Sequence, residues 1–454
     1  MLALQVACTS PTISAAPPAA TTIDQDLLDV TVPQLHQLYA DKKYSVTQVV
    51  KWHLDRIDRY NGVYGAIETL FRKDALDQAA QQDAAAADAG TRRGALWGVP
   101  VVIKANTSIK GYTTTAGWEG FTRAGHELIA PQDATIVAKF KQAGAIIIGT
   151  ANMPDLANSD TNRSTSFGRT GNAYDVRFSP GGSSGGVVTA VAANFAVLGN
   201  GTDTGNSIRM PAATSALVGV FPTRGLVSIA GIAPLDWLLD NTGPIARTAT
   251  DAAIALGVMA GADPLDPRTN ELPASTQRPP YESQLKADAL KGKRFGVPAF
   301  VLAGEGVPFH GIPYAVPDAV VDKLRKAADT PIKPETRAMF MKAVEALRAA
   351  GADVVIDDNI LPVAFARIAS RVATYAYMLD GTNRFLAAFG PTEYHSDAEY
   401  LKAVGSPLFM SSVGSEKYFH TFGNVHIDQR VIDKDPDADR MYRLPKQAMA
   451  DAYL

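Results

Sequence analysis

The chain is poor in the residues that build disulfides and metal sites. Its 454 residues include one cysteine, Cys8, so neither an internal disulfide nor a zinc site made of cysteines is available. The seven histidines contain no HExxH pair, the helical zinc motif of metalloproteases. We therefore expect scattered structural or surface histidines, no metal and no cofactor.

The chain also lacks a strong net charge and long apolar runs. Its 43 Lys and Arg nearly balance its 46 Asp and Glu, and no basic run is longer than two residues. This balance argues against electrostatic binding of nucleic acid or of an anionic membrane. No apolar run approaches the roughly 20 residues that a membrane-spanning helix needs. We expect a small-molecule partner, and the oligomeric state stays open.

The N-terminus has an unusual composition. The stretch MLALQVACTSPTISAAPPAATT has a short apolar start, then Val-Ala-Cys, then a spacer of Ser, Thr, Pro and Ala. One interpretation is the remnant of a bacterial lipoprotein or export signal, with a lipid anchor at Cys8 and a periplasmic location. The other is a flexible arm on a cytoplasmic protein. Both place residues 1–28 outside the fold.

Short apolar strands alternate with amphipathic helices along the chain. A helix is predicted to start at Ser45, where Ser45 and Gln48 form a capping box. Further helices are predicted at 74–89, closed by Gly90, and at 134–143, capped by Asp133. The predicted strands are 98–104, 145–149, 293–298 and 352–357.

This alternation predicts an α/β fold. We expect one large domain over residues 29–454, with a mixed, mostly parallel sheet covered by helices on both faces. The Pro-rich stretch 262–283 is predicted to be a surface excursion from it.

The hexapeptide GGSSGG at 181–186 precedes the strongly apolar stretch 187–198. It cannot be a phosphate loop, because Val187 stands where such a loop needs lysine. It does contain the GxSxG pattern of α/β-hydrolases, which would make Ser183 a nucleophile on a strand–turn–helix elbow. The strand side of that elbow is poor, because Asp175, Arg177 and Pro180 precede it.

Two other stretches carry candidate chemistry. In GTDTGNSIRMPA, 201–212, Ser207 follows a loop of small residues, which lets several backbone N–H groups converge as an oxyanion hole requires. Lys104 ends the apolar run GVPVVIK. Burial lowers a lysine pKa, and a neutral lysine is a competent general base.

Together, these stretches resemble the amidase signature family. The resemblance rests on five strings in order: GVPVVIK, GTANMPDL at 149–156, SPGGSSGGVVTAVAA, GTDTGNSIRMPA and DNTGPIARTATDAA at 240–253. It implies the amidase signature fold and a serine amidohydrolase that needs no metal or cofactor. Ser207 would be the nucleophile, Ser183 the bridging serine after a cis Gly182–Ser183 bond, and Lys104 the base.

The resemblance also implies an oxyanion hole and supporting residues. The oxyanion hole would use the backbone N–H groups of Thr204, Gly205, Asn206 and Ser207. Ser184, Asp203 and Arg209 match motif positions, with loop shaping as the alternative to a direct role. The sequence departs from the family pattern at Asn206, usually Gly, and at Ala105, usually Asp. It also ends in PKQAMADAYL without the family's further strands, and we expect the natural protein to be longer.

The substrate is predicted only by class. Trp118, Met153, Leu235 and Trp237 are pocket candidates that suggest an apolar or aryl amide, an anilide or a carbamate, with core packing as the alternative for each. Three other functions stay open: a GxSxG esterase using Ser183, a component of a tRNA-dependent amidotransferase, and a non-catalytic lipoprotein that binds small molecules.

Overall fold

The computed structural model describes residues 22–88, 90, 93–271, 280–304, 317–327, 330–357, 359–360, 372, 374–408, 429–441, 443 and 447. Its main sheet has six strands in the order β1-β3-β2-β4-β6-β5. Their bounds are β1 Ile67–Leu70, β2 Pro100–Lys104, β3 Ile146–Ala151, β4 Leu198–Asp203, β5 Val218–Gly219 and β6 Asn241–Ala246. The expected α/β fold with a mixed sheet is confirmed.

Parallel pairing is confined to the centre of the sheet. β2 pairs parallel with both β3 and β4, whereas β1–β3, β4–β6 and β5–β6 are antiparallel. The expectation of a mostly parallel sheet is therefore wrong. β4 and β6 run in opposite directions, and an apolar run in the sequence does not show in which direction its strand will pair. Every residue of β2, β3, β4 and β6 is buried. β2 ends at Lys104 and β4 ends at Asp203, and because the two strands are parallel neighbours, both residues lie at the same edge of the sheet.

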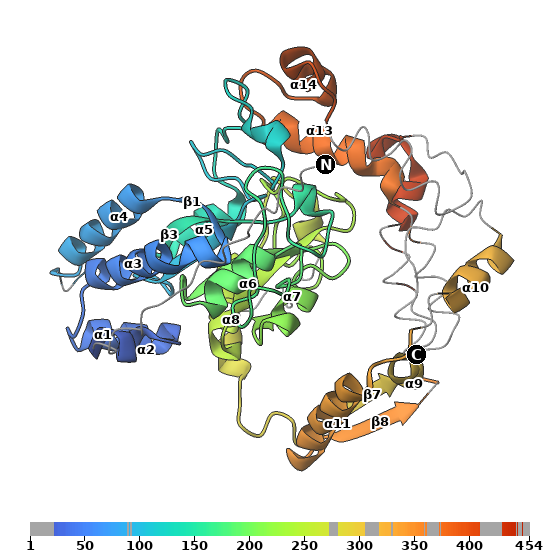
Figure 1. Ribbon diagram of the computed structural model, residues 1–454, viewed down its shortest axis with the longest axis horizontal. Coiled ribbons are helices and arrows are strands. Elements are labelled where there is room, and N and C mark those ends of the chain that lie inside the picture. Colours follow the sequence, from blue (N-terminus) through green and yellow to red (C-terminus); the bar gives the residue numbers. More distant parts are fainter. Residues whose placement is uncertain are drawn as a thin grey trace, which may run out of the picture.

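Helices flank this sheet, as Figure 1 shows. In the part of the chain around the sheet, α4 packs on β3, α6 on β2 and β4, and α8 on β6. The helices there are α1 Thr22–Leu27, α2 Val32–Ala40, α3 Val46–Tyr64, α4 Arg72–Ala85, α5 Thr135–Gln142, α6 Gly185–Ala192, α7 Arg209–Thr214 and α8 Ala249–Met259. The 3₁₀ turns of the described residues are Glu119–Thr122, Asp155–Ala157, Pro267–Asn270, Tyr281–Gln284, Tyr375–Tyr377 and Ile432–Lys434.

Helix boundaries agree with the sequence where a capping side chain marks them. Ser45 caps α3 through the predicted capping box. Two expectations are wrong. α4 starts at Arg72 and ends at Ala85, since Phe71 precedes it with no capping side chain. Asp133 does not cap α5; its carboxylate instead accepts from the Lys110 N–H at 2.9 Å and from Lys141 Nζ at 2.8 Å.

The packed part of the chain also starts earlier than residue 28. Leu27, in α1, is fully buried and belongs to the main core. Asp29 and Asn194 are joined by two hydrogen bonds, which tie this segment to the turn after α6. The expected boundary is therefore too late. The short helix α1 buries Leu27, and the neighbouring polar residues give no sign of a packed segment. Cys8 and the rest of residues 1–21 lie outside the described residues.

A second, two-stranded sheet lies apart from the first in Figure 1. β7 Arg294–Pro298 and β8 Asp353–Asp357 pair in parallel, which confirms both as strands. α9 Ala299–Ala303, α10 Asp318–Ala327 and α11 Pro334–Ala349 lie between them in sequence. α13 Met378–Phe389 and α14 Asp397–Val404 contribute Phe385 and Tyr400 to a core with Phe121. Residues 272–279 of the Pro-rich stretch and most of PKQAMADAYL lie outside the described residues. Asp263, Asp266 and Thr269, in the described part of the Pro-rich stretch, are buried, so this part of the predicted surface excursion packs against the fold.

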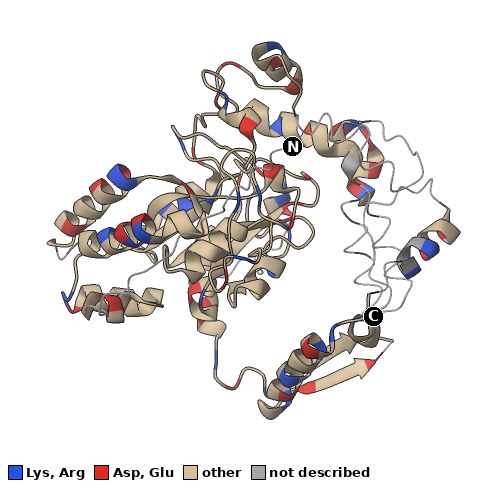
Figure 2. Cartoon of the chain, in the orientation of Figure 1, with Lys and Arg blue, Asp and Glu red and all other residues tan. Residues whose placement is uncertain are grey.

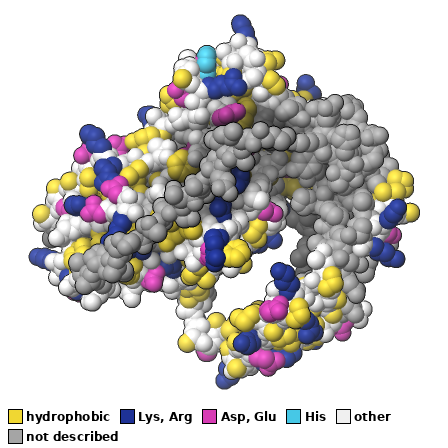
Figure 3. All heavy atoms as spheres, viewed as in Figure 1, with side chains coloured by type: hydrophobic (Ala, Val, Ile, Leu, Met, Phe, Trp, Pro, Cys, Tyr) yellow, Lys and Arg dark blue, Asp and Glu magenta, His cyan; other side chains and the backbone are white. Residues whose placement is uncertain are grey.

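Charges are mixed over the described surface. Figure 2 shows acidic and basic side chains together on α3, α4 and α11, and the face in Figure 3 also mixes both signs with apolar side chains. In the part of the chain that the structure describes, no helix combines the length and the apolar character that crossing a membrane requires.

Candidate active site

Lys104 is wholly buried at the carboxyl end of β2. Its Nζ donates to Ser183 Oγ at 2.8 Å, to Ser184 Oγ at 3.1 Å and to Thr202 Oγ1 at 2.7 Å. An ammonium group has three N–H donors, so these three hydroxyls satisfy it. The hydroxyls of Ser183 and Thr202 can also donate a proton, so the same cage accommodates a neutral amine. The strand end thus holds the lysine in a pocket of hydroxyl groups.

The electrostatics of this pocket favour the neutral form of Lys104. Burial lowers its pKa to about 7, while the nearby carboxyls of Asp203 and Asp240 act in the opposite direction. A lysine with such a pKa is unprotonated in a large fraction of molecules near neutral pH. It can therefore accept a proton from Ser183.

The hexapeptide that contains Ser183 is the turn before α6. The Gly182–Ser183 peptide bond is cis, which confirms what the resemblance implied. Gly181 has φ +80°, a left-handed conformation that favours glycine. A Cβ at Gly186 would lie 2.2 Å from the carbonyl oxygen of Asn152, so only glycine lets the backbones approach this closely. Ser183 and Ser184 are both wholly buried.

Ser184 holds the turn against β4. Its Oγ donates to the Thr202 carbonyl at 3.3 Å and accepts from the Thr202 N–H at 3.3 Å. It also accepts from Lys104, so its hydrogen-bonding capacity is occupied by the protein. These contacts match the loop-shaping interpretation of Ser184.

The ion pair between Asp203 and Arg209 holds the loop that contains Ser207. Buried Asp203 accepts from the Ile208 N–H at 2.9 Å and from Arg209 Nη2 at 3.0 Å. The Arg209 guanidinium also lies over the ring of Phe221, 4.4 Å from its centroid. Asp203 and Arg209 therefore act on the loop's shape.

The loop leaves backbone donors available. Within the described part of the chain, none of the N–H groups of Thr204, Gly205, Asn206 and Ser207 donates to a protein acceptor. Free N–H groups beside a serine are what an oxyanion hole requires.

Ser207 lies at the end of this loop and is 6% exposed. Its Oγ donates to Asn206 Oδ1 at 3.5 Å, and not to Ser183. Asn206 Nδ2 in turn donates to Asp160 Oδ2 at 3.4 Å. Asn206 does not have positive φ. The structure thus joins Lys104 to Ser183 directly and leaves the Ser183–Ser207 step without a hydrogen bond.

Sequence reasoning missed Thr202 and Asn106. Thr202 Oγ1 accepts from Lys104 Nζ at 2.7 Å and from Asn106 Nδ2 at 3.2 Å. The parallel pairing of β2 with β4 brings these residues together. Thr202 stands inside the quoted motif at 201–212, and polar residues at the ends of two adjacent strands are the signal that could have found it.

The four pocket candidates have different surroundings. Met153 is buried and packs with Leu235 and Ala105, next to Lys104 in sequence. Trp118 packs against Phe121 and Tyr400, with ring centroids 5.0 and 5.9 Å apart. Trp237 lies under the guanidinium of Arg268, 5.0 Å from its ring centroid. Met153 and Leu235 thus pack against the residue that follows the lysine, and a pocket role for any of the four candidates stays a prediction.

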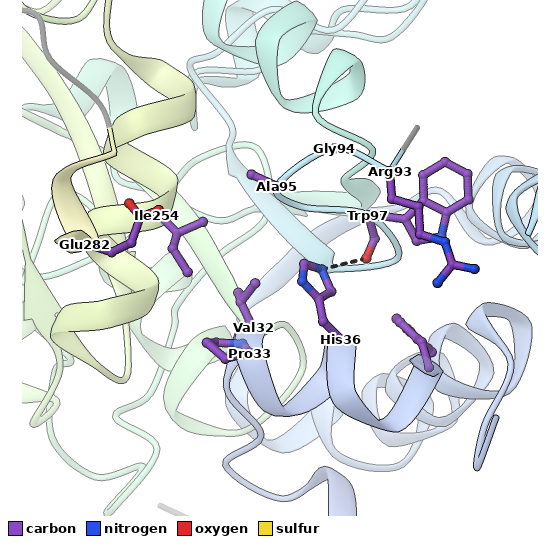
Figure 4. Close-up of a pocket in the computed structure, with 10 residues that line it drawn as sticks. Val32, Pro33, His36, Arg93, Gly94, Ala95, Trp97, Ile254 and Glu282 are labelled. Atoms are coloured by element: carbon purple, nitrogen blue, oxygen red, sulfur yellow. Dashed lines mark hydrogen bonds between the residues drawn. The ribbon is translucent and has the colours of Figure 1, made fainter. Parts of the chain in front are cut away.

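Two hollows in the described surface lie outside this constellation. One, of about 450 Å³, lies between α2, residues 93–97 and α8 (Figure 4). There His36 Nε2 is 3.1 Å from the Trp97 carbonyl oxygen. The other, of about 580 Å³, includes Trp237 and residues 432–436. Neither is lined by Lys104, Ser183 or Ser207.

A family comparison agrees with the site geometry. The family model described as Amidase matches residues 48–306, which is more than half of the chain and includes the whole Lys104–Ser183–Ser207 constellation. The chain belongs to the amidase family, the amidase signature proteins that its motifs resemble.

The chain is also similar to individual proteins. It is 39% identical over 272 residues to a glutamyl-tRNA(Gln) amidotransferase subunit from Alkaliphilus metalliredigens, covering 60% of this chain and 53% of that protein. The corresponding protein from Moorella thermoacetica is 39% identical over 273 residues, covering 60% and 54%. The chain spans about half the length of these relatives.

Among solved structures, the peptide amidase from Stenotrophomonas maltophilia is similar, with a TM-score of 0.68 and 28% identity, over 91% of this chain and 78% of that chain. An amidase family protein from Bacillus anthracis str. Ames has a TM-score of 0.69 and 26% identity, over 93% and 77%.

Proposed function

We propose that the chain is a serine amidohydrolase that cleaves the C–N bond of a small to medium amide through an acyl-Ser207 intermediate. The observation that carries this proposal is the wholly buried Lys104, whose Nζ lies 2.8 Å from Ser183 Oγ and whose pKa burial lowers to about 7. A buried amine of this kind is a base with an immediate proton donor.

The reaction follows from proton transfer along these residues. Neutral Lys104 accepts the proton of Ser183, and Ser183 accepts the proton of Ser207 as the Ser207 oxygen attacks the amide carbonyl. The Ser207 hydroxyl must therefore rotate away from Asn206 toward Ser183, a movement of the kind that substrate binding often completes. The tetrahedral intermediate has a negative oxygen, which the free N–H groups of residues 204–207 stabilise.

Collapse of the intermediate breaks the C–N bond. Lys104 returns a proton through Ser183 to the leaving nitrogen, which departs as a neutral amine and leaves the acyl group on Ser207. Water then attacks this ester by the same relay, giving the carboxylic acid and free Ser207. Asp203 and Arg209 keep the loop in shape throughout, while Ser184 and Thr202 hold the lysine.

The substrate is proposed as a class. Met153 and Leu235 give the surroundings of Ala105 an apolar character, which favours an apolar or aryl amide, anilide or carbamate. The likeness to a peptide amidase supports an amide as the scissile group. The same acyl transfer serves all three classes.

The experiment is a panel of amides, anilides, carbamates and esters assayed with the wild type and with Ser207→Ala. We expect turnover of at least one C–N substrate by the wild type and none above background by the variant. Equal turnover by both would contradict the proposal. Thermal denaturation of the two proteins verifies that the variant is folded.

A second candidate is supported by the relatives in Alkaliphilus and Moorella, which are amidotransferase subunits. In that role the same site would release ammonia from an amide donor for use by a partner protein. Glutaminase activity that appears only in a reconstituted complex would favour it. Turnover of aryl amides by the isolated chain favours the free amidase.

A further inference from the structure

Asp240 is a buried carboxyl group that the relay does not use. It directly precedes β6, whose first residue, Asn241, pairs with Asp203 at the end of β4. The loop of residues 204–207 starts at that same point. Asp240 therefore lies at the base of the loop proposed to form the oxyanion hole.

One carboxylate joins two loops at this position. Thr204 Oγ1 donates to Asp240 Oδ1 at 2.5 Å, and the Leu235 N–H donates to Oδ2 at 2.9 Å. The Asp236 N–H donates to both oxygens at 3.2 Å. Asp240 thus connects residue 204, the first of the oxyanion loop (residues 204–207), with residues 235–236 of the apolar loop IAGIAPLDWLL (residues 229–239).

The apolar loop contacts the site from its other side. The Leu235 side chain packs with Met153 and Ala105, the residue after Lys104. Asp236 fixes the rest of the loop, because its carboxylate accepts from the N–H groups of Leu238 and Leu239 and from the Thr374 hydroxyl. Leu235 and Thr204 are therefore held relative to each other through the Asp240 carboxylate.

The charged groups around Asp240 come from several elements. Lys104 at the end of β2 interacts with Asp240 and with Asp203 at the end of β4. Asp236 lies on the same loop, and Arg224 acts on Asp236. Burial raises the pKa of Asp240 to about 7, with the nearby Asp236 carboxyl acting in the same direction. Lys104 and Asp240 therefore both have a pKa near neutral pH, and the Asp240 carboxylate favours the charged form of Lys104.

We propose that Asp240 is a positioning residue for acyl transfer: it holds the oxyanion loop through Thr204 and the pocket wall through Leu235, and its negative charge acts on Lys104. This inference rests on the proposed amidohydrolase function. Asp240 touches neither Ser207 nor Ser183 by any hydrogen bond in the described chain, so it acts through its neighbours.

Two variants separate the two effects. Asp240→Asn keeps the shape and one acceptor oxygen for the Leu235 and Asp236 N–H groups, and the Thr204 hydroxyl can reverse to accept from the new amide. It therefore removes mainly the charge. Thr204→Val keeps the shape of residue 204 and removes only the link to the carboxylate. Thr135→Val is the matched control, because Thr135 also donates to an aspartate, Asp263, away from the site.

The experiment measures, as a function of pH, the rate at which a fluorophosphonate labels Ser207, together with kcat and KM for an amide turned over by the wild type. Without the carboxylate charge the ammonium form of Lys104 is less favoured. Asp240→Asn is therefore expected to move the midpoint of the rise in labelling rate and in kcat/KM to lower pH. Thr204→Val removes a hydrogen bond that lowers the pKa of Asp240, so it weakens the carboxylate charge without abolishing it. It should therefore move the midpoint less than Asp240→Asn does, and lower kcat about 10-fold or more with little change in KM. Thr135→Val should change neither.

The double variant tests the link itself. Asp240→Asn replaces the charged hydrogen bond to Thr204 by a weaker neutral one, and Thr204→Val removes that same hydrogen bond. The double variant should therefore lose less kcat than the product of the two single losses. The inference would be overturned by an Asp240→Asn variant whose pH midpoint equals that of the wild type, together with a double variant whose kcat loss equals the product of the two single losses. The proposed function would still stand in that case, provided that the fluorophosphonate labels Ser207 of the wild type. A wild type that neither turns over amides nor is labelled at Ser207 would overturn the proposed function, and this inference with it.

Discussion

Lys104 Nζ and Ser183 Oγ lie 2.8 Å apart although 79 positions separate the two residues in sequence. β2 ends at Lys104, α6 starts two residues after Ser183, and α6 packs on β2. The contact is thus a product of the fold and is wholly buried. In the proposed mechanism this contact supplies a base that is not a histidine, and the first predictions concern this base.

Replacing Lys104 by Met should abolish most of the activity. Met has a similar length and no basic nitrogen, so kcat/KM is expected to fall by about 10²–10⁴-fold, as for loss of a general base. Lys139→Met is the matched control, because Lys139 is a partly buried lysine that donates to the carbonyls of Met259 and Ala260 away from the site. Near-wild-type kcat/KM in Lys104→Met would point to the GxSxG mechanism with Ser183 as nucleophile.

The pH profile should show the titration of Lys104. Since the neutral amine is the active form and burial lowers its pKa to about 7, kcat/KM should rise with pH through about 7. The same shift affects the free energy of unfolding. The pKa of Lys104 is lower in the folded than in the unfolded chain. The contribution of neutral, buried Lys104 to stability is therefore complete above the ordinary lysine pKa and is lost as pH falls through about 7. Kinetics and denaturant unfolding over this pH range measure both. An activity limb near the ordinary pKa of lysine would contradict the burial argument.

Removing Arg209 should loosen the oxyanion loop. Arg209→Met breaks the ion pair with buried Asp203, which keeps its backbone donors, so the fold should survive. We expect kcat to fall about 10-fold or more with a smaller change in KM, because the loop donors act on the transition state. Arg177→Met is the control, since Arg177 pairs with Asp175 on the surface. If both variants behave alike, Arg209 does not shape the loop.

Glycines in α6 and α3 should respond oppositely to alanine. A Cβ at Gly186 would meet the backbone of Asn152 at 2.2 Å, so Gly186→Ala should destabilise the fold by about 1–3 kcal/mol or more. A Cβ at Gly62, inside α3, meets nothing within 4 Å, so Gly62→Ala should stabilise by about 0.4–1 kcal/mol. Urea unfolding midpoints compare the two. A tolerated Gly186→Ala would mean that the turn before α6 can move away from Asn152.

The sequence predicts the residues of the relay better than their environment. Lys104, Ser183 and Ser207 stand in motifs that resemble those of the amidase signature family, and that resemblance is what proposes a role for each of them. Thr202 and Asp240 are as close to the chemistry, but their roles depend on which strands are neighbours. That information lies in pairings such as β2 with β4 and β4 with β6, which no local pattern encodes.

The same limit applies to the fold. Apolar runs predicted β7 and β8 as strands, yet not that they pair with each other in a separate sheet. Capping chemistry predicted the start of α3, because Ser45 and Gln48 act locally. It failed for Asp133, because this carboxylate accepts hydrogen bonds from the backbone N–H of Lys110 and from the Lys141 ammonium instead of from the first turn of α5. Local interactions are readable from sequence, and competing tertiary contacts are not.

The central claim is that Ser207, and not Ser183, is the nucleophile. Trypsin leaves both serines on one peptide, 178–209, so the adduct of a fluorophosphonate must be assigned by fragment ions within that peptide. The account predicts an adduct on Ser207 in the wild type, formed far more slowly in Lys104→Met and Ser183→Ala. An adduct on Ser183, or labelling of Ser207 at the wild-type rate without Lys104, would contradict it.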